Sequence, residues 1–352
     1  EADVAVIFAG LPEIFESEGY DRTSMKLPKC QDRLIEEVLK VQPNVVVVLH
    51  NGSPVELPWA DRVSAILEMY LGGQGVGEAC DRLLFGEANP SGRLSETFPY
   101  RLEDNPSFLH FPGNGKRVLY GEDIFVGYRY YDTKKVPVRY AFGHGLSYTE
   151  FTYGDLTLSS AQMTDEDILT VSLKVKNSGK TEGKEVVQLY VADLCGISER
   201  PVKELKGFAK VHLLPGEEKT VSMEISARNL SYYEERLGDW YAPSGTYRIL
   251  IGHASDDIRL HADVVFETKK KLPLRVDFTT TFGELLDHTK TAPVITELLA
   301  PLAAAAASAE GMSDEYKKLG EQVIREMPLK SLLGQMPGEQ VEQLIGQLNC
   351  LL

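Results

Sequence analysis

Positive charge is scarce in this chain, and long apolar runs are absent. The 352 residues contain 37 Lys and Arg against 52 Asp and Glu, which gives a formal net charge of −15. Because no basic stripe matches a phosphate backbone, we expect no nucleic-acid partner. No apolar stretch approaches the roughly 18 residues that span a bilayer, so we also expect no membrane segment.

Cysteine is rare as well. The four thiols, Cys30, Cys80, Cys195 and Cys350, are scattered and form no C-x-x-C motif. This pattern predicts no disulfide framework and is typical of reduced thiols in a cytoplasmic protein. No residue pattern calls for a metal or a cofactor. The sequence opens on Glu1 rather than Met and has no signal peptide, so we expect an upstream part of the molecule to lie outside it.

The apolar content of 43% suffices for packed cores in two or three domains. Ala5 to Ala9 and Asn44 to Leu49 are continuous apolar runs, which predict strands buried on both faces of a parallel sheet. Residues 27–39 carry an apolar stripe at helical spacing, so strand and helix together form an α/β layer. The glycine-rich run at 72–77 matches no phosphate-binding motif, and we interpret it as close backbone packing at the sheet edge.

The loop after the first strand concentrates charge. Residues 15–22 (FESEGYDR) include Glu16, Glu18, Asp21 and Arg22. Loops that leave the carboxyl ends of parallel strands are where ligands bind in α/β sheets, and a carboxyl group in a cleft is suited to general acid catalysis near neutral pH. Arg22 could hold Asp21 ionised through a bidentate pair. A solvated acidic loop with a weak surface ion pair is the alternative.

The pattern changes twice further along the chain. Residues 110–150 alternate aromatic, glycine and charged residues without a period, which predicts a connector held down by its aromatic side chains. Period-two segments separated by turns then predict a β-sandwich of the immunoglobulin or fibronectin type III kind; they lie at 169–175, 186–191, 220–225, 246–251 and 261–266. Helical segments follow at 282–288, 293–307, 314–326 and 338–348, with 300–311 expected to be a mobile linker.

Taken together, these segments resemble the carboxyl-terminal half of family 3 glycoside hydrolases, the β-glucosidases with a fibronectin type III-like domain. The resemblance rests on SEGYDR (17–22), LPKCQDRLI (27–35), VVVVLHNGSPVEL (45–57), GGQGVGEACDRLLFGEANPSGRLSETFP (72–99), FPGN (111–114), LYGEDIFVGYRYYD (119–132) and YAFGHGLSYTEF (140–151). It covers about residues 1–266. The tail from about 280 is similar to an extension of some bacterial members.

The resemblance implies a fold class of α/β plus all-β. We expect a three-layer α/β sandwich, incomplete at its start, then a fibronectin type III-like β-sandwich and a small helical tail. The corresponding boundaries are 1–110 for the α/β domain, 111–150 for the aromatic-rich connector, 151–267 for the β-sandwich and 280–352 for the tail. The β-sandwich itself carries no catalytic constellation.

In this family an amino-terminal barrel supplies the Asp nucleophile, and the α/β domain supplies the acid/base Glu. Glu18 matches that acid/base, while Tyr20, Asp21 and Arg22 match the residues that shape the loop. Glu16 is a neighbouring carboxylate that could be mistaken for the catalytic one. The nucleophile is not in this chain, so the expected partner is the barrel half of the same enzyme, on a separate chain or in a segment outside this sequence.

The resemblance therefore predicts the acid/base-bearing half of a retaining β-glucosidase-type glycosidase, which hydrolyses terminal β-linked sugars from oligosaccharides or glycosides. A glycoside substrate and a possible homodimer complete the expected partners. The alternative is a non-catalytic carbohydrate-binding or scaffold fragment, because one carboxylate cannot run a two-carboxylate mechanism. Without the barrel, Glu18 is expected to be exposed to solvent on its loop.

Overall fold

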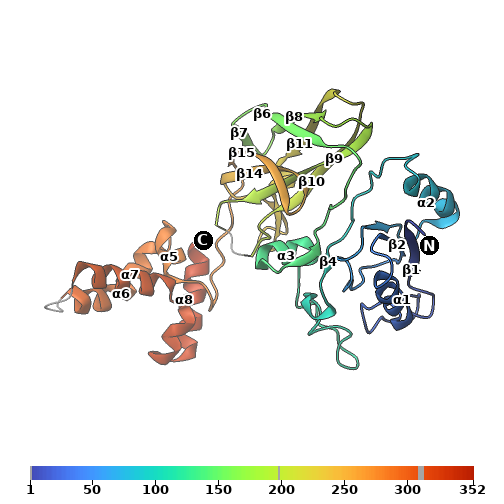
Figure 1. The fold of residues 1–352 in the computed structure, drawn as a ribbon. Helices are drawn as coiled ribbons and strands as arrows, with labels where there is room; N and C mark the ends of the chain where they lie inside the picture. The colour runs from blue at the N-terminus through green and yellow to red at the C-terminus, as the bar shows by residue number, and fades with distance from the viewer. Residues whose placement is uncertain (1, 197–198, 308–312) are drawn as a thin grey trace. The chain divides into compact units, whose positions relative to one another are not determined.

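The computed structural model describes residues 2–196, 199–307 and 313–352 (Figure 1). They divide into two compact units. The first comprises Glu1–Tyr232 with Tyr241–Lys269 and contains the α/β sheet, the connector and the β-sandwich. The second comprises Tyr233–Trp240 with Lys270–Leu352 and contains the helical tail. No helix among the described residues has the length and apolar character needed to cross a membrane.

The α/β part is built on a three-stranded parallel sheet in the order β1-β2-β3. The strands are β1 (Ala5–Gly10), β2 (Val45–His50) and β3 (Ala65–Glu68). Helix α1 (Lys29–Leu39) connects β1 to β2, and helix α2 (Val76–Leu84) follows β3. Val45, Val47 and Leu49 of β2 are buried together with Ile35 of α1. The predicted α/β layer is therefore confirmed, with β2 as its central strand.

The prediction that the first strand is buried on both faces is wrong. Ile7 and Ala9 lie in the core, whereas Val6 is 40% and Phe8 61% exposed. Since β1 pairs only with β2 among the described strands, it is an edge strand, and side chains alternate between the two faces of a strand. Only one of those faces is covered in the part of the chain described here.

The interpretation of the glycine-rich run as close packing fails for three of its four glycines; only at Gly72 would a Cβ atom come close to another residue, 2.6 Å from the Val76 side chain. Gly73–Gly75 form a short 3₁₀ turn, η1, ahead of α2. A Cβ atom at Gly73, Gly75 or Gly77 would meet no atom within 4 Å. Gly73 has φ +63°, a backbone conformation that favours glycine, so the turn rather than a close approach explains glycine there.

The connector contains a helix that its sequence did not predict. The connector contains α3 (Tyr128–Lys134) and β5 (Val138–Tyr140), and β4 (Phe98–Pro99) and η2 (Leu102–Asp104) precede it. Because α3 has only seven residues, it is too short to display a helical period. Its Tyr128 ring stacks on Phe142, with centroids 4.8 Å apart, and meets Tyr190 edge-on at 5.8 Å. These contacts agree with the predicted role of aromatic residues in holding the connector down.

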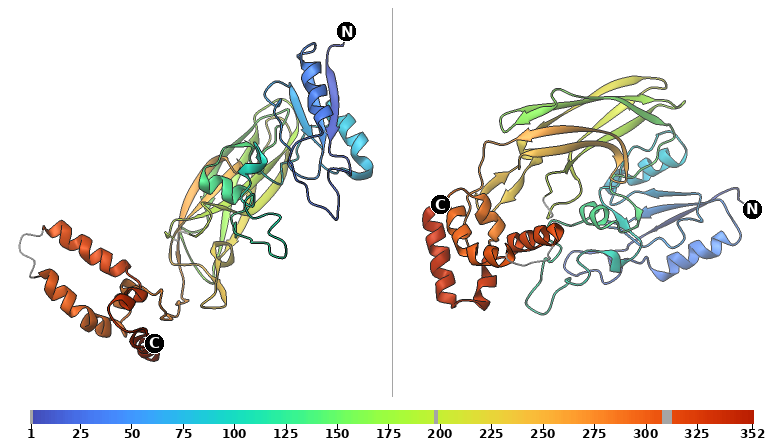
Figure 2. Two further views of the ribbon diagram at one scale, coloured as in Figure 1. Left: turned by 90° about the horizontal axis from the view of Figure 1, so that it is seen from below. Right: turned by 90° about the vertical axis from the view of Figure 1, so that its left-hand side faces the viewer.

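The β-sandwich consists of two sheets that lie face to face (Figure 2). One has the order β10-β9-β14-β15-β7 and the other β11-β8-β6. The bounds are β6 (Phe151–Leu158), β7 (Gln162–Thr164), β8 (Ile168–Asn177), β9 (Gly183–Asp193), β10 (Glu204–Leu213), β11 (Glu218–Ser226), β14 (Gly245–Ala254) and β15 (Asp257–Glu267), with α4 (Ala227–Leu230), β12 (Tyr232–Glu234) and β13 (Asp239–Tyr241) between β11 and β14. All five predicted strands are present, whereas the long strands β6 and β10 and the short strands β7, β12 and β13 were missed.

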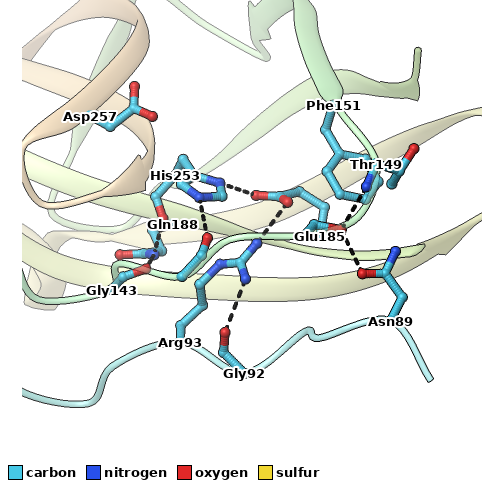
Figure 3. A network of polar contacts seen from close by, with 12 residues as sticks. Asn89, Gly92, Arg93, Gly143, Thr149, Phe151, Glu185, Gln188, His253 and Asp257 are labelled. Carbon is cyan, nitrogen blue, oxygen red and sulfur yellow. Dashed lines mark hydrogen bonds and ion pairs between the residues drawn. The ribbon is translucent and has the colours of Figure 1, made fainter. Parts of the chain in front are cut away.

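A buried carboxylate joins the β-sandwich to the segment that follows α2 (Figure 3). Glu185 on β9 is fully buried; Arg93 Nη2 donates to its Oε2 at 2.9 Å, and His253 Nδ1 lies 2.6 Å from its Oε1. Tyr153 Oη donates to Oε1 at 2.8 Å. Burial raises the pKa of Glu185, but His253, Arg93 and Tyr153 outweigh burial and lower it overall. The carboxylate is thus held ionised by partners from three segments.

The second unit is helical, as predicted. Its helices are α5 (Phe282–Asp287), α6 (Ala292–Ala307), α7 (Asp314–Glu326) and α8 (Gly338–Leu351), with the 3₁₀ helix η3 (Leu329–Gly334). Thr281 Oγ1 accepts from Glu284 N at 3.2 Å while Glu284 Oε2 accepts from Thr281 N at 2.8 Å, a capping box that starts α5. Since α6 continues to Ala307, the linker predicted at 300–311 is helical that far, and its remainder lies outside the described residues.

We predict that Arg93→Met destabilises the first unit by about 3–5 kcal/mol, because it removes one partner of a buried carboxylate. Urea unfolding followed by circular dichroism measures the change. The matched control is Arg248→Met, which breaks the exposed ion pair to Asp263 and should leave the unfolding midpoint unchanged. Equal effects of the two substitutions would contradict a structural role for the Glu185 cluster.

Candidate functional site

The candidate site lies at the carboxyl edge of the parallel sheet. The loop 11–25 leaves β1 there, and the turn 51–54 leaves the neighbouring strand β2. Ligands of α/β sheets bind at this edge, because adjacent parallel strands bring their carboxyl-end loops together. Glu18 is on the first of these loops and is exposed to solvent, as expected from the sequence.

Glu16 and Arg22 hold the loop against the β2 turn on either side of Glu18. The Glu16 carboxylate accepts hydrogen bonds from Gly52 N at 2.6 Å and from Ser53 Oγ at 2.7 Å. Arg22 lies 3.6 Å from Glu16, donates to Ser53 Oγ, and donates to Pro54 O at 3.3 Å. The side chains of Glu16 and Arg22 are only 20% and 18% exposed. Glu18 therefore protrudes from a segment that is fixed at both ends.

The predicted pair between Arg22 and Asp21 is not the one that forms. Arg22 is paired with Glu16 instead, and Asp21 is exposed. The reason is geometric: Arg22 points inward to the β2 turn, where Ser53 and Pro54 supply further acceptors. Tyr20 is half-exposed, and its hydroxyl donates to the carbonyl of Glu13 within the same loop.

Two carboxyl groups that the sequence did not single out lie near Glu16 and Arg22. Burial raises the pKa of Glu68, at the end of β3, to about 7, with the hydrogen bonds from Tyr70 N and Asn51 opposing the rise. Burial, followed by the charge of Glu16, raises the pKa of Glu96 to about 7. Glu68 could have been found from its place in the sequence, because it ends the strand that follows β2. A parallel neighbour of β2 ends at the same edge of the sheet.

A cleft opens beside this group of carboxylates. It has a volume of about 500 Å³, and its lining includes Arg22, Glu96, Thr97, Glu122 and Tyr131. Two buried polar atoms of the lining, Thr97 Oγ1 and Glu122 Oε2, have no hydrogen-bond partner among the described residues. Within that part of the chain, no group of His, Cys, Asp and Glu side chains is arranged to hold a metal ion.

Comparison with known proteins identifies the two parts of the first unit. The family model of the glycosyl hydrolase family 3 C-terminal domain matches residues 1–148, and that of the fibronectin type III-like domain matches residues 185–255. The chain belongs to glycosyl hydrolase family 3. The fold class expected from the sequence, an α/β domain followed by a fibronectin type III-like β-sandwich, is thereby confirmed.

Relatives within this family include proteins named β-glucosidase. The thermostable beta-glucosidase B of Acetivibrio thermocellus is 48% identical over 352 residues, which cover 99% of this chain and 46% of that protein. The beta-glucosidase of Kluyveromyces marxianus is 47% identical over 258 residues, 73% of this chain and 30% of that protein. The match to the Acetivibrio protein extends over the helical unit.

Solved structures give the same result. The crystal structure of the Kluyveromyces marxianus enzyme in complex with glucose matches with a TM-score of 0.71 and 45% identity, over 75% of this chain and 32% of that one. The crystal structure of the Bifidobacterium adolescentis GH3 beta-glucosidase matches with a TM-score of 0.75 and 39% identity, over 83% of this chain and 43% of that one. The chain spans less than half the length of these relatives.

The raised pKa of Glu96 predicts a pH dependence of stability. Its pKa of about 7 in the folded chain exceeds the roughly 4.3 of an unfolded Glu, so its contribution to stability is present below the unfolded value and is lost as the pH rises through about 7. Glu96→Gln should therefore reduce the loss of stability between about pH 5 and pH 8. Urea unfolding at both pH values tests this, with the exposed Glu103→Gln as the matched control.

Proposed function

We propose that this chain is the acid/base-bearing half of a retaining β-glucosidase-type glycosidase and that Glu18 is the acid/base. The observation that carries the proposal is the position of Glu18. It is an exposed carboxyl group at the carboxyl edge of the sheet, on a loop fixed by Glu16 and Arg22, in a chain 48% identical to a protein named β-glucosidase.

A retaining glycosidase needs two carboxyl groups about 5–5.5 Å apart on either side of the scissile bond. In the proposed mechanism Glu18 first donates its proton to the leaving oxygen while the nucleophile forms a covalent glycosyl intermediate. Glu18 then removes a proton from the water that hydrolyses the intermediate. The nucleophile comes from the remainder of the enzyme, which in this proposal is the barrel half.

Glu16 is the neighbouring carboxylate against which this assignment has to be tested. Both of its oxygens accept hydrogen bonds, from Gly52 N and from Ser53 Oγ, and Arg22 lies 3.6 Å away. A general acid must present an oxygen to the leaving group, and both oxygens of Glu16 are already engaged by the β2 turn. Positioning of the loop is therefore the role proposed for Glu16.

In the complete enzyme, Glu18→Gln should slow the hydrolysis of unactivated glucosides by about 10²–10⁴-fold, the usual contribution of a general acid. Formation of the glycosyl intermediate from a 2,4-dinitrophenyl β-glucoside should be nearly unaffected, because that leaving group departs without protonation. Single-turnover kinetics on both substrates measure the two effects.

Glu16→Gln is the matched control for that experiment. It also replaces a loop carboxylate by an amide, but it weakens the attachment to the β2 turn, so activity on both kinds of substrate should fall together. If Glu18→Gln showed this uniform loss and Glu16→Gln showed the leaving-group dependence, the roles would have to be exchanged. If Glu18→Gln changed nothing, the acid/base would lie elsewhere.

A non-catalytic carbohydrate-binding or scaffold fragment is the second candidate. It is favoured by one observation: Glu16, the nearest carboxylate in the loop, is already engaged by the β2 turn and is not available as a nucleophile. Both candidates predict that this chain alone does not turn over an aryl β-glucoside. Addition of the barrel half separates them, because activity should then appear only if the chain carries the acid/base. Turnover by the isolated 352-residue chain would contradict both.

A further inference from the structure

The cleft beside the loop is not explained by the acid/base chemistry of Glu18. Its walls come from the 11–25 loop, the β2 turn, the segment around β4, and the connector ahead of α3. Arg22, Ser53 and Glu96 line one part, and Glu122 belongs to the connector. A volume of about 500 Å³ lies in the range of ligand pockets and easily admits a long polar side chain.

The lining leaves buried hydrogen-bonding capacity unused. Thr97 is 5% exposed, and its Oγ1 has no partner among the described residues. Glu122 Oε2 is likewise buried without a partner there. Buried polar atoms are nearly always hydrogen-bonded in folded proteins, and an unsatisfied carboxylate oxygen is especially costly. These two atoms therefore indicate a ligand that donates hydrogen bonds.

The charges of the lining indicate the sign of that ligand. Arg22 is the only cation of the lining, and it is already engaged by Glu16, Ser53 and Pro54. Glu96 and Glu122 therefore leave the cleft with an excess of negative charge. A neutral polyol would satisfy hydrogen bonds without offsetting this charge, whereas a guanidinium or ammonium group does both.

Resting on the proposed function, we propose that the cleft receives a guanidinium or ammonium side chain of the polypeptide that supplies the nucleophile. Two observations favour this source. The relatives are more than twice as long as the part they share with this chain, since the match covers 46% of the Acetivibrio protein and 30% of the Kluyveromyces one. The net charge of −15 also favours a basic contact surface on a polypeptide that binds it.

Binding in the cleft should strengthen with pH. The charged and titratable groups that interact with Glu96 are Glu16 and Arg22 from the loop and Glu68 and Tyr70 from the end of β3, and Glu122 lines the same cleft. Because the pKa of Glu96 is raised to about 7, its carboxylate is largely protonated at about pH 6 and ionised at about pH 8. A cation should accordingly bind more tightly at the higher pH, and its binding should lower the pKa of Glu96.

The test is a titration of the 352-residue chain with ethylguanidinium chloride at constant ionic strength. Binding is monitored through the amide NMR signals of Thr97 and Gly127, two residues that line the cleft. We expect both signals to shift and saturate, with affinity higher at pH 8 than at pH 6. Glu122→Gln should weaken binding by about tenfold, the effect of losing one charge-assisted hydrogen bond. Glu103→Gln removes an exposed charge nearby and should leave binding unchanged.

Thr97→Val provides a second, uncharged variant, which should weaken binding less than Glu122→Gln does and keeps the test valid if Glu122→Gln fails to fold. Glucose is titrated in parallel. Saturable shifts of the same amides by glucose but not by ethylguanidinium would overturn the proposal in favour of a sugar site. Unchanged affinity in both cleft variants, or no shift with ethylguanidinium, would also overturn it. None of these outcomes depends on Glu18, whose role is tested separately by the leaving-group experiment.

Discussion

The Glu16 carboxylate connects the loops that follow two neighbouring parallel strands. It accepts hydrogen bonds from the turn after β2, at Gly52 N and Ser53 Oγ, while Arg22 closes the same contact from the far end of the loop. A loop of this length would otherwise sample many backbone conformations, each of which carries Glu18 to a different place. The position of the exposed carboxyl group therefore depends on an interaction two residues away from it.

A fully buried carboxylate, Glu185, plays a comparable part in the β-sandwich. Glu185 binds Arg93 from the segment after α2 and His253 from β14 (Figure 3), and it accepts a hydrogen bond from Tyr153 of β6. A buried charge is tolerable only when its partners are complete, so this cluster fixes the register between the sandwich and the segment that leads to β4. Both clusters use a carboxylate as an acceptor for donors on separate segments.

Much of this arrangement could be predicted from the sequence. The apolar run of β2, the stripe of α1, the period-two strands of the sandwich and all four tail helices follow directly from hydrophobic periodicity. The short helix α3 could not be found in this way, because seven residues are too few to show a period. The exposure of Val6 and Phe8 on β1 was missed because a continuous apolar run does not tell whether a second layer covers the strand.

The candidate site was predictable in its location but not in its internal contacts. The motif at 17–22 placed Glu18, Tyr20, Asp21 and Arg22 on one loop, and the structure keeps them there. Which carboxylate Arg22 meets depends on the β2 turn, about 30 residues away in sequence, and no local pattern encodes that contact. Glu68 joins the site because the sheet brings the end of β3 to this edge, whereas Glu96 reaches it on the segment ahead of β4.

Gly52 links two segments that are far apart in the chain. A Cβ atom at this position would lie 3.2 Å from the carboxylate of Glu16, so a side chain there would require this carboxylate, which accepts from Gly52 N, to shift. The conformation of loop 11–25 and the residue at position 52 therefore depend on each other, although about 30 residues separate them in sequence.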